Sequence, residues 1–353
     1  MLEGSTRLRW ISESASGELF AGKDAPLFGR RQKRPRGPRL PVVAVTGFLG
    51  SGKTTLIRAL LDKPQAANTA VIVNEYGEIG IDHALLRSSS DVTVLLGNGC
   101  LCCNVRSDLR ALFADRARGA VPSFERVVIE TSGLADPGPV LQTFATDRSL
   151  GREFHLQALI SVVDAVNGEG NLERMPEAKK QVALADRIVI SKSDLADPGK
   201  TECLTRNIAS LNTAPVAIAV NGDIEPSFLL DEPHSTRRSF DLGDAEHTHG
   251  LCSFSLILER PLSWPSFAQT MAVLTALRGP DLLRVKGIVA VEECRGPVIV
   301  HFVQHVAHPP VELEDWPDDD RRSRLVFVTR GLAREPVARL FAGVAAIAGS
   351  ARV

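Results

Sequence analysis

The sequence predicts an α/β protein with a doubly wound, mostly parallel sheet, followed by a second, smaller α+β domain. Three observations lead to this fold class. Seven short aliphatic runs alternate with helical or loop segments between residues 41 and 222. A glycine-rich motif lies between the first aliphatic run and the first helix. After about residue 232 the pattern changes to longer strands around two helices.

The first domain takes its sheet from the seven aliphatic runs. The first, PVVAVTG, is apolar throughout and ends in glycine, as expected of a strand buried on both faces. A helix carrying Leu56, Leu60 and Leu61 follows it. The predicted strands are residues 41–47, 69–75, 92–97, 126–131, 158–165, 186–194 and 215–222.

Composition shifts divide the chain into four parts. Residues 1–40 include the basic, proline-rich stretch GRRQKRPRGPRLP and are expected to be a disordered tail. Residues 41–232 form the first domain, and the polar, turn-rich residues 233–250 form a linker. Residues 251–353 form the second domain. Its predicted strands are 250–262, 282–291, 297–308 and 323–331, with one helix through Phe267, Met271, Leu274 and Leu277 and another over 336–349.

Composition also excludes several classes of protein. The formal net charge of -1 gives no field that would attract nucleic acid or an anionic membrane. No apolar run has the length of a membrane span, and no secretory signal is visible, so we expect a cytoplasmic protein. In a reducing cytosol, cysteines are more often ligands or catalysts than disulfides.

The motif GFLGSGKTT matches the phosphate-binding loop G-x-x-x-x-G-K-[ST] from Gly47 to Thr54. Its glycines, Gly50 and Gly52 among them, allow backbone N–H groups to turn toward phosphate oxygens. Lys53 is expected to reach the β- and γ-phosphates, and the Thr54 hydroxyl to bind Mg²⁺. Nucleotide binding is the firmest functional prediction, because strand and helix flank the motif as the mechanism requires.

The segment SKSD after the sixth predicted strand resembles the guanine-reading element N-K-x-D, with Ser191 in place of asparagine. Asp194 would accept hydrogen bonds from the guanine ring N–H and amine, and the stem of Lys192 would lie over the base. Loss of the asparagine removes one supporting hydrogen bond and predicts softer base selectivity. Asn221 follows the next strand and is a candidate for the rest of the base pocket.

Two carboxylates and a glycine follow other strand ends, where ligand sites of open α/β sheets gather. Glu130 in VVIETSG is placed for a contact to Mg²⁺ or water. Gly133 would let its loop approach the γ-phosphate. Glu75 in NEYGEIGID directly follows a strand and is expected to order around Mg²⁺ or to bind a second metal.

Three of the six cysteines lie within GNGCLCC: Cys100, Cys102 and Cys103. Thiolates are soft ligands that suit Zn²⁺, Cu(I) and sometimes Co²⁺ better than Mg²⁺. Three ligands do not close a tetrahedral cage, which fits a metal that is bound and released. The alternatives are a redox pair or inert buried thiols. His301 and His305, on one predicted strand face, are weaker ligand candidates.

Together, the motifs GFLGSGKTT, NEYGEIGID, GNGCLCC, ETSGLADP and SKSD closely resemble the CobW-like metallochaperone GTPases, from residue 41 to about residue 349. The resemblance implies a P-loop GTPase domain and a CobW C-terminal domain. It implies a GTP-hydrolysing protein that delivers zinc or cobalt to a client metalloprotein, with GTP, Mg²⁺ and Zn²⁺ (or Co²⁺) as bound species. The residue positions described above indicate Lys53, Glu130 and Glu75 as the candidate catalytic residues. By match to the family, Gly50, Gly52, Lys53, Thr54 and Thr55 would bind phosphate and Mg²⁺, Lys192 and Asp194 would bind guanine, and Cys100, Cys102 and Cys103 would bind the metal. The positions of the residues add Gly47, Ser51, Gly133 and Asn221 to the candidate nucleotide-binding residues, and Thr54 and Glu75 to the candidate metal ligands.

The mechanism we infer from the sequence is that GTP and Mg²⁺ order the loops holding Glu75 and the cysteines, so that hydrolysis releases the metal. Hydrolysis is expected to be slow without metal or partner, because no arginine finger or water-orienting glutamine is evident. A nucleotide-dependent homodimer is compatible with this class. Two rival functions stay open: an ATP-dependent kinase or transferase on the same P-loop, and a non-catalytic zinc sensor.

Overall fold

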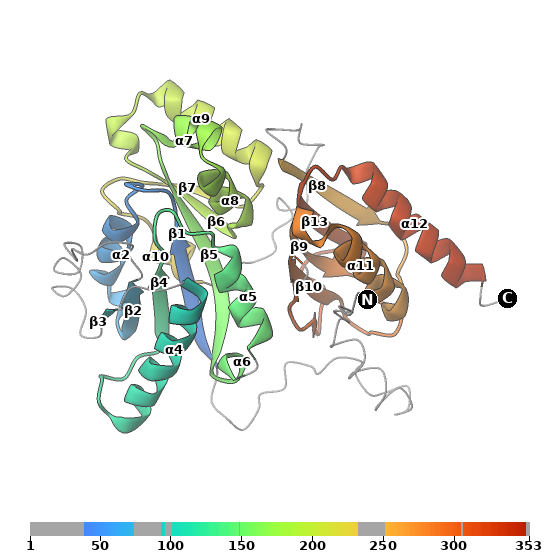
Figure 1. Cartoon of the computed structure of the whole chain (residues 1–353), viewed down its shortest axis with the longest axis horizontal. Helices are drawn as coiled ribbons and strands as arrows, with labels where there is room; N and C mark the ends of the chain where they lie inside the picture. Colours follow the sequence, from blue (N-terminus) through green and yellow to red (C-terminus); the bar gives the residue numbers. More distant parts are fainter. Residues whose placement is uncertain are drawn as a thin grey trace, which may run out of the picture. The chain divides into compact units, whose positions relative to one another are not determined.

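The structure, a computed structural model, describes residues 39–73, 93–95, 101–147, 149–231, 251–304 and 306–350. These residues form two compact units that divide near residue 253, and each unit is described by itself (Figure 1). No helix in these ranges is long and apolar enough to cross a membrane.

The first unit is built on a seven-stranded sheet with the strand order β3-β2-β4-β1-β5-β6-β7, in which all neighbours are parallel. All seven strands coincide with predicted aliphatic runs, and the doubly wound fold class is confirmed. The strands are β1 (Leu40–Thr46), β2 (Thr69–Val73), β3 (Thr93–Leu95), β4 (Arg126–Glu130), β5 (Phe154–Asp164), β6 (Arg187–Ser191) and β7 (Val216–Ala219).

Helices cover both faces of this sheet (Figure 1). They are α2 (Lys53–Leu61), α4 (Leu101–Arg118), α5 (Gly138–Thr146), α6 (Leu150–Glu153), α7 (Gly168–Arg174), α8 (Pro176–Leu184), α9 (Pro198–Leu211) and α10 (Pro226–Leu230), with 3₁₀ turns η1 (Pro64–Ala66) and η2 (Ser193–Leu195). Leucines and isoleucines of α2 and α10 pack on β1, β4, β5 and β6 in one continuous apolar cluster. That packing holds α2, and therefore the loop before it, rigidly against the central strand.

The strand order puts β1 in the centre of the sheet, between β4 and β5. The loops that follow β1, β4, β5 and β6 therefore meet at the carboxyl edge of four adjacent parallel strands, where open α/β sheets bind ligands.

The second unit has a six-stranded sheet in the order β11-β10-β9-β13-β8, with β12 also paired to β10. Its registered pairs are antiparallel. The elements are β8 (Leu251–Leu258), α11 (Trp264–Arg278), η4 (Gly279–Asp281), β9 (Leu282–Val289), β10 (Val298–Val303), β11 (Val306–Ala307), β12 (Val311–Glu312), β13 (Ser323–Arg330) and α12 (Arg334–Ser350). The predicted α+β character is confirmed, and the predicted strand over 297–308 is divided into β10 and β11 by a turn.

Phenylalanines join α11 and α12 to this sheet. Phe267 of α11 lies 6.4 Å from Phe302 of β10 and 6.1 Å from Phe341 of α12, between ring centroids. Of the predicted apolar stripe on α11, Phe267, Met271 and Leu274 are buried, whereas Leu277 is 73% exposed because it lies past the edge of the contact.

Of the predicted histidine pair, His301 can be placed in β10, and the ligand role expected for His301 with His305 stays a prediction. His305 lies outside the described residues, and the ring of His301 stacks on His308 at a centroid distance of 4.3 Å. Parallel stacking directs ring nitrogens side by side rather than toward one shared point. This arrangement favours packing over chelation.

Candidate functional site

The phosphate-binding motif forms the loop between β1 and α2, as its sequence predicts. Gly47 has a φ of 148°, and a Cβ at this position would lie 2.3 Å from the carbonyl oxygen of Val162 on β5. A side chain at this position would clash with β5, so glycine is required where the chain leaves β1 and turns into the loop. Gly50 and Gly52 are also left-handed, and the loop leads into the N-terminus of α2. A helix N-terminus preceded by such a loop is an anion-binding arrangement.

The side chain of Lys53, the first residue of α2, points back into this loop. Its ammonium donates hydrogen bonds to the carbonyl oxygens of Gly47 at 2.9 Å and Phe48 at 3.2 Å, and the residue is 8% exposed. The charge is therefore placed within the ring of backbone atoms that would surround a phosphate. This position fits the predicted contact of Lys53 with the β- and γ-phosphates.

Thr54 and Glu130 come together from two elements. The Thr54 hydroxyl, at the start of α2, donates to Glu130 Oε1 at the end of β4 over 2.8 Å. The pairing follows from topology, because β1 and β4 are adjacent parallel strands. A hydroxyl and a carboxylate are hard oxygen donors, the type that Mg²⁺ selects, and they lie beside the phosphate loop. These residues fit the predicted magnesium site.

The loop after β4 lies against the phosphate loop. A Cβ on Gly133 would be 2.8 Å from both the backbone nitrogen and Cα of Leu49. Thr131 donates its backbone N–H to Val45 at 2.9 Å and its hydroxyl to Thr46 at 3.0 Å. The loop at Gly133 therefore lies directly against the phosphate loop, and its approach to the γ-phosphate stays a prediction.

The base-reading segment after β6 is joined to the phosphate loop by two side chains. Lys192, with a left-handed φ of 55°, donates to the carbonyl of Gly50 at 2.7 Å and to Asp164 Oδ2 at 2.8 Å. The Ser191 hydroxyl donates to the carbonyl of Ser51 at 2.6 Å. Ser191 therefore makes a hydrogen bond of its own, and the softer base selectivity expected from the loss of asparagine stays a prediction. The short hydroxyl reaches the phosphate loop itself.

The two remaining base-pocket candidates are exposed and lie at the same end of the sheet. Asp194 is in η2, directly after Lys192 and Ser193. Asn221 has a left-handed φ of 53° in the turn after β7. The next residue, Gly222, is so close to α2 that a Cβ there would lie 2.6 Å from the carbonyl oxygen of Thr55.

Asp164 is a site residue that the sequence reasoning missed. It ends β5, is 4% exposed, and accepts hydrogen bonds from Lys192 and from the backbone N–H of Val166 at 2.7 Å and Asn167 at 3.3 Å. Burial alone would raise the pKa of Asp164, but the hydrogen bonds, led by that of Lys192, hold the pKa of this carboxyl below its usual value. Its place at a strand's carboxyl end was the available sequence signal.

The cysteine motif is described only in part. Cys102 and Cys103 lie in the first turn of α4, whose backbone is described there without side chains. Cys100 and Glu75 lie outside the described residues, so their predicted roles stay predictions. Within the ranges the structure covers, no group of three or more His, Cys, Asp or Glu side chains is spaced to hold a metal ion.

Comparison with known proteins gives matches over both units. The profile of the CobW/HypB/UreG nucleotide-binding domain matches residues 41–218, and the profile of the cobalamin synthesis protein CobW C-terminal domain matches residues 251–345.

Among curated relatives, the zinc chaperone YjiA of Escherichia coli is 32% identical in an alignment of length 318 that covers 86% of this chain and 98% of that protein. The zinc chaperone CobW of Pseudomonas aeruginosa is 29% identical and covers 85% of this chain and 90% of its own. A crystal structure of Zn(II)-bound YjiA GTPase from E. coli matches with a TM-score of 0.67 at 27% identity, over 87% of this chain and 99% of that one.

Proposed function

The chain belongs to the CobW/HypB/UreG family of nucleotide-binding proteins, and from this premise we propose that it is a GTP-hydrolysing metallochaperone. It binds zinc, or alternatively cobalt, and passes the metal to a client metalloprotein under nucleotide control. One observation carries the proposal. At one edge of the sheet, the Thr54–Glu130 pair lies beside the phosphate loop, and Lys192 bonds to that loop. The names of the zinc-chaperone relatives support the metal.

Nucleotide binding begins with the phosphates. Backbone N–H groups from Gly50 to Thr55 surround the phosphate oxygens, and the Lys53 ammonium moves from its carbonyl partners to the β- and γ-phosphates. Gly47 keeps the loop against β5. The Lys53 ammonium and the dipole of α2 offset the negative charge that develops during hydrolysis on the phosphates of the leaving GDP.

Guanine is read by the segment after β6. The Lys192 stem covers the base plane, Asp194 accepts from the ring N–H and the amine, and Asn221 closes the pocket. Because Lys192 and Ser191 both bond to the phosphate loop, a base held by this segment stays in a fixed position relative to the phosphates. The preference for GTP over ATP comes from Asp194, whose carboxylate matches two donors that adenine lacks.

Magnesium is the resident cofactor that Thr54 and Glu130 would hold, with Glu75 as a further carboxylate. When bound, Mg²⁺ supplies positive charge to the β- and γ-phosphate oxygens. The Thr54–Glu130 hydrogen bond orients the hydroxyl in advance. Lys53, Glu130 and Glu75 are the catalytic residues of the proposal, and Gly133 brings its loop to the γ-phosphate.

The transported metal is bound by Cys100, Cys102 and Cys103, whose soft thiolates select zinc or cobalt over magnesium. GTP orders the cysteine loop, the ordered loop binds the metal tightly, and hydrolysis weakens both interactions. We further propose that the metal is passed to a client protein and that the protein is cytoplasmic. The division of the chain into four parts and a nucleotide-dependent homodimer are also proposals.

A nucleotide competition assay separates this proposal from its rivals. Purified protein is loaded with zinc, and phosphate release from GTP is followed in the presence of excess ATP and with Cys102→Ser. The proposal expects GTP hydrolysis that ATP does not suppress and that loses its zinc dependence in the cysteine variant. Preference for ATP with no effect of the thiols would indicate a kinase or transferase. Zinc binding without any phosphate release would indicate a sensor.

A further inference from the structure

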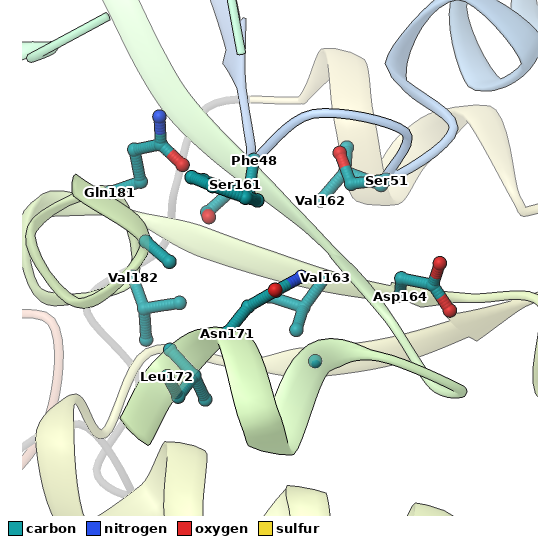
Figure 2. A pocket seen from close by; sticks show the side chains of 12 residues that line it. Phe48, Ser51, Ser161, Val162, Val163, Asp164, Asn171, Leu172, Gln181 and Val182 are labelled. Carbon is teal, nitrogen blue, oxygen red and sulfur yellow. The ribbon is translucent and has the colours of Figure 1, made fainter. Parts of the chain in front are cut away.

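A small cavity lies behind the phosphate loop, between β5 and helices α7 and α8 (Figure 2). It has room for about one water molecule. Among the side chains that line it are Ser51 of the phosphate loop, Ser161 of β5 and Gln181 of α8. The cavity therefore touches three elements that are far apart in the sequence.

Three polar atoms around this cavity share one property. Ser51 Oγ, Ser161 Oγ and Gln181 Oε1 are buried and make no hydrogen bond to the residues that the structure describes. Ser51, Ser161 and Gln181 are each 1% exposed, so bulk water does not reach them. Buried polar groups in native proteins are paired with protein or with an ordered water. Three such atoms around a space of this size define a site for one bridging water.

The other end of the Gln181 amide holds the loop after β4. Its Nε2 donates to the carbonyl oxygens of Gly133 and Ala135, both at 3.0 Å. The loop thus lies between Gln181 on one side and the phosphate loop on the other, because Gly133 abuts Leu49. Both amide hydrogens are used, and a planar amide with both hydrogens engaged has little freedom to turn.

We propose that Gln181 is a positioning residue for GTP hydrolysis. It fixes Gly133 at the distance from the phosphate loop at which that glycine meets the γ-phosphate. A buried water links the amide oxygen of Gln181 to the hydroxyls of Ser51 and Ser161, so the two loops keep one relative position. The inference rests on the proposed GTPase function. Since GDP has no γ-phosphate, Gln181 acts on hydrolysis and not on GDP binding.

The test compares two Gln181 variants with a control of similar chemistry. Gln181→Leu removes the donors. Gln181→Glu keeps the shape, but an ionised carboxylate only accepts hydrogen bonds, whereas a neutral carboxyl donates one. The control is Asn212→Leu. Asn212 is also buried, and its Nδ2 donates to the carbonyls of Val182 at 2.7 Å and Ala185 at 2.8 Å, at the end of the same helix, away from the loop.

The expected results separate positioning from stability. Gln181→Leu lowers kcat by about 10- to 100-fold, the effect of a displaced group in an active site, and leaves GDP affinity within about twofold. Asn212→Leu lowers the melting temperature and leaves kcat unchanged below it.

A pH profile adds a readout that a purely structural role would not move. Burial raises the pKa of the carboxyl introduced by Gln181→Glu, so its kcat recovers as the pH falls and this group becomes neutral. The charged groups near the cavity and loop include Asp164 with its partner Lys192, and Asp136 with its partner Lys180. Glu130 at the start of the loop and Lys53 in the phosphate loop are also close. They are present in both proteins, so the ratio of variant to wild-type kcat isolates the introduced carboxyl.

Three outcomes would overturn the inference. In the first, Gln181→Leu hydrolyses GTP at the wild-type rate. In the second, the ratio for Gln181→Glu does not change with pH. In the third, a high-resolution crystal structure with a non-hydrolysable GTP analogue shows no water in the cavity, or an amide turned away from Gly133, and this test needs no variant. If the wild-type protein does not hydrolyse GTP, the proposed function is rejected instead. The crystal structure would then be the remaining test of whether Gln181 holds Gly133 in position.

Discussion

The most quantitative prediction concerns Asp147, which contacts the helix that carries the cysteine motif. Asp147 follows α5, and its side chain is 6% exposed. Its carboxylate accepts from the backbone N–H groups of Ser149 at 2.9 Å and Leu150 at 3.2 Å. It also pairs with Arg106 at 2.5 Å and Arg110 at 3.2 Å, both on α4. Because Cys102 and Cys103 lie in the first turn of α4, this carboxylate holds the helix on which the proposed metal loop depends.

The size of the effect follows from the pKa of Asp147. Burial would raise this pKa, but the hydrogen bonds of Ser149 and Leu150 and the charge of Arg106 outweigh burial and lower the pKa from 3.8 to about 2. One pKa unit corresponds to about 1.4 kcal/mol, so the ionised form contributes up to about 2.5 kcal/mol to the free energy of unfolding. Both arginines are half exposed, and solvent screening reduces the figure to about 1–2 kcal/mol.

The folded-state pKa is lowered, so this stabilisation is complete above the unfolded-state pKa and is lost as the pH falls toward the folded-state value. Asp147→Asn keeps the shape and removes the charge. Urea unfolding of the variant should give a free energy about 1–2 kcal/mol below wild type at neutral pH. Between about pH 5 and pH 3 roughly half of that difference should disappear.

The matched control is Asp115→Asn, which removes the partly exposed partner of the exposed Arg118 on the same helix and should change stability by less than about 0.5 kcal/mol. An equal gap between wild type and Asp147→Asn at neutral and acid pH would refute the reasoning.

Two further predictions concern the links between the phosphate loop and the base-reading segment. Ser191→Ala leaves the buried carbonyl of Ser51 without this donor, which should cost about 1–3 kcal/mol in urea unfolding and weaken GTP binding in a nucleotide titration. Ser193→Ala in the same segment is its control, and equal behaviour of the two would count against the link. Lys192→Met keeps the stem over the base but leaves Asp164 buried without its cation. Stability should fall by about 1–3 kcal/mol and GTP affinity should fall with it, whereas the exposed Lys200→Met should change neither. An unchanged GTP affinity in Lys192→Met would contradict the proposed role.

Much of the fold was predictable from the sequence because its signals are local. Each strand of the parallel sheet is a short aliphatic run, since strands buried on both faces need apolar residues throughout. The phosphate loop was predictable for the same reason, because its glycines, Lys53 and Thr54 act within a few residues of one another. In the second unit, the turn at Gln304 that separates β10 from β11 has a left-handed φ of 53° at a residue that gives no turn signal.

The site was predictable from the sequence only where its residues lie within one short segment of the chain. Ser191 bonds to a carbonyl 140 positions away, and Gln181 bonds to carbonyls 48 and 46 positions away. Partners at such separations follow from the strand order, which local patterns do not determine. Asp164 was missed because its role depends on Lys192, which reaches it only after β5 and β6 pair.

The most direct test of the account is the zinc affinity of the reduced protein, measured by competition with a chromogenic chelator in the presence of a non-hydrolysable GTP analogue and, separately, of GDP. The account predicts tighter zinc binding with the GTP analogue by about 5- to 150-fold, an equal tightening of analogue binding by zinc, and loss of the difference in Cys102→Ser. Identical zinc affinity in the two nucleotide states, or no zinc binding in either, would contradict the claim that bound GTP controls the metal.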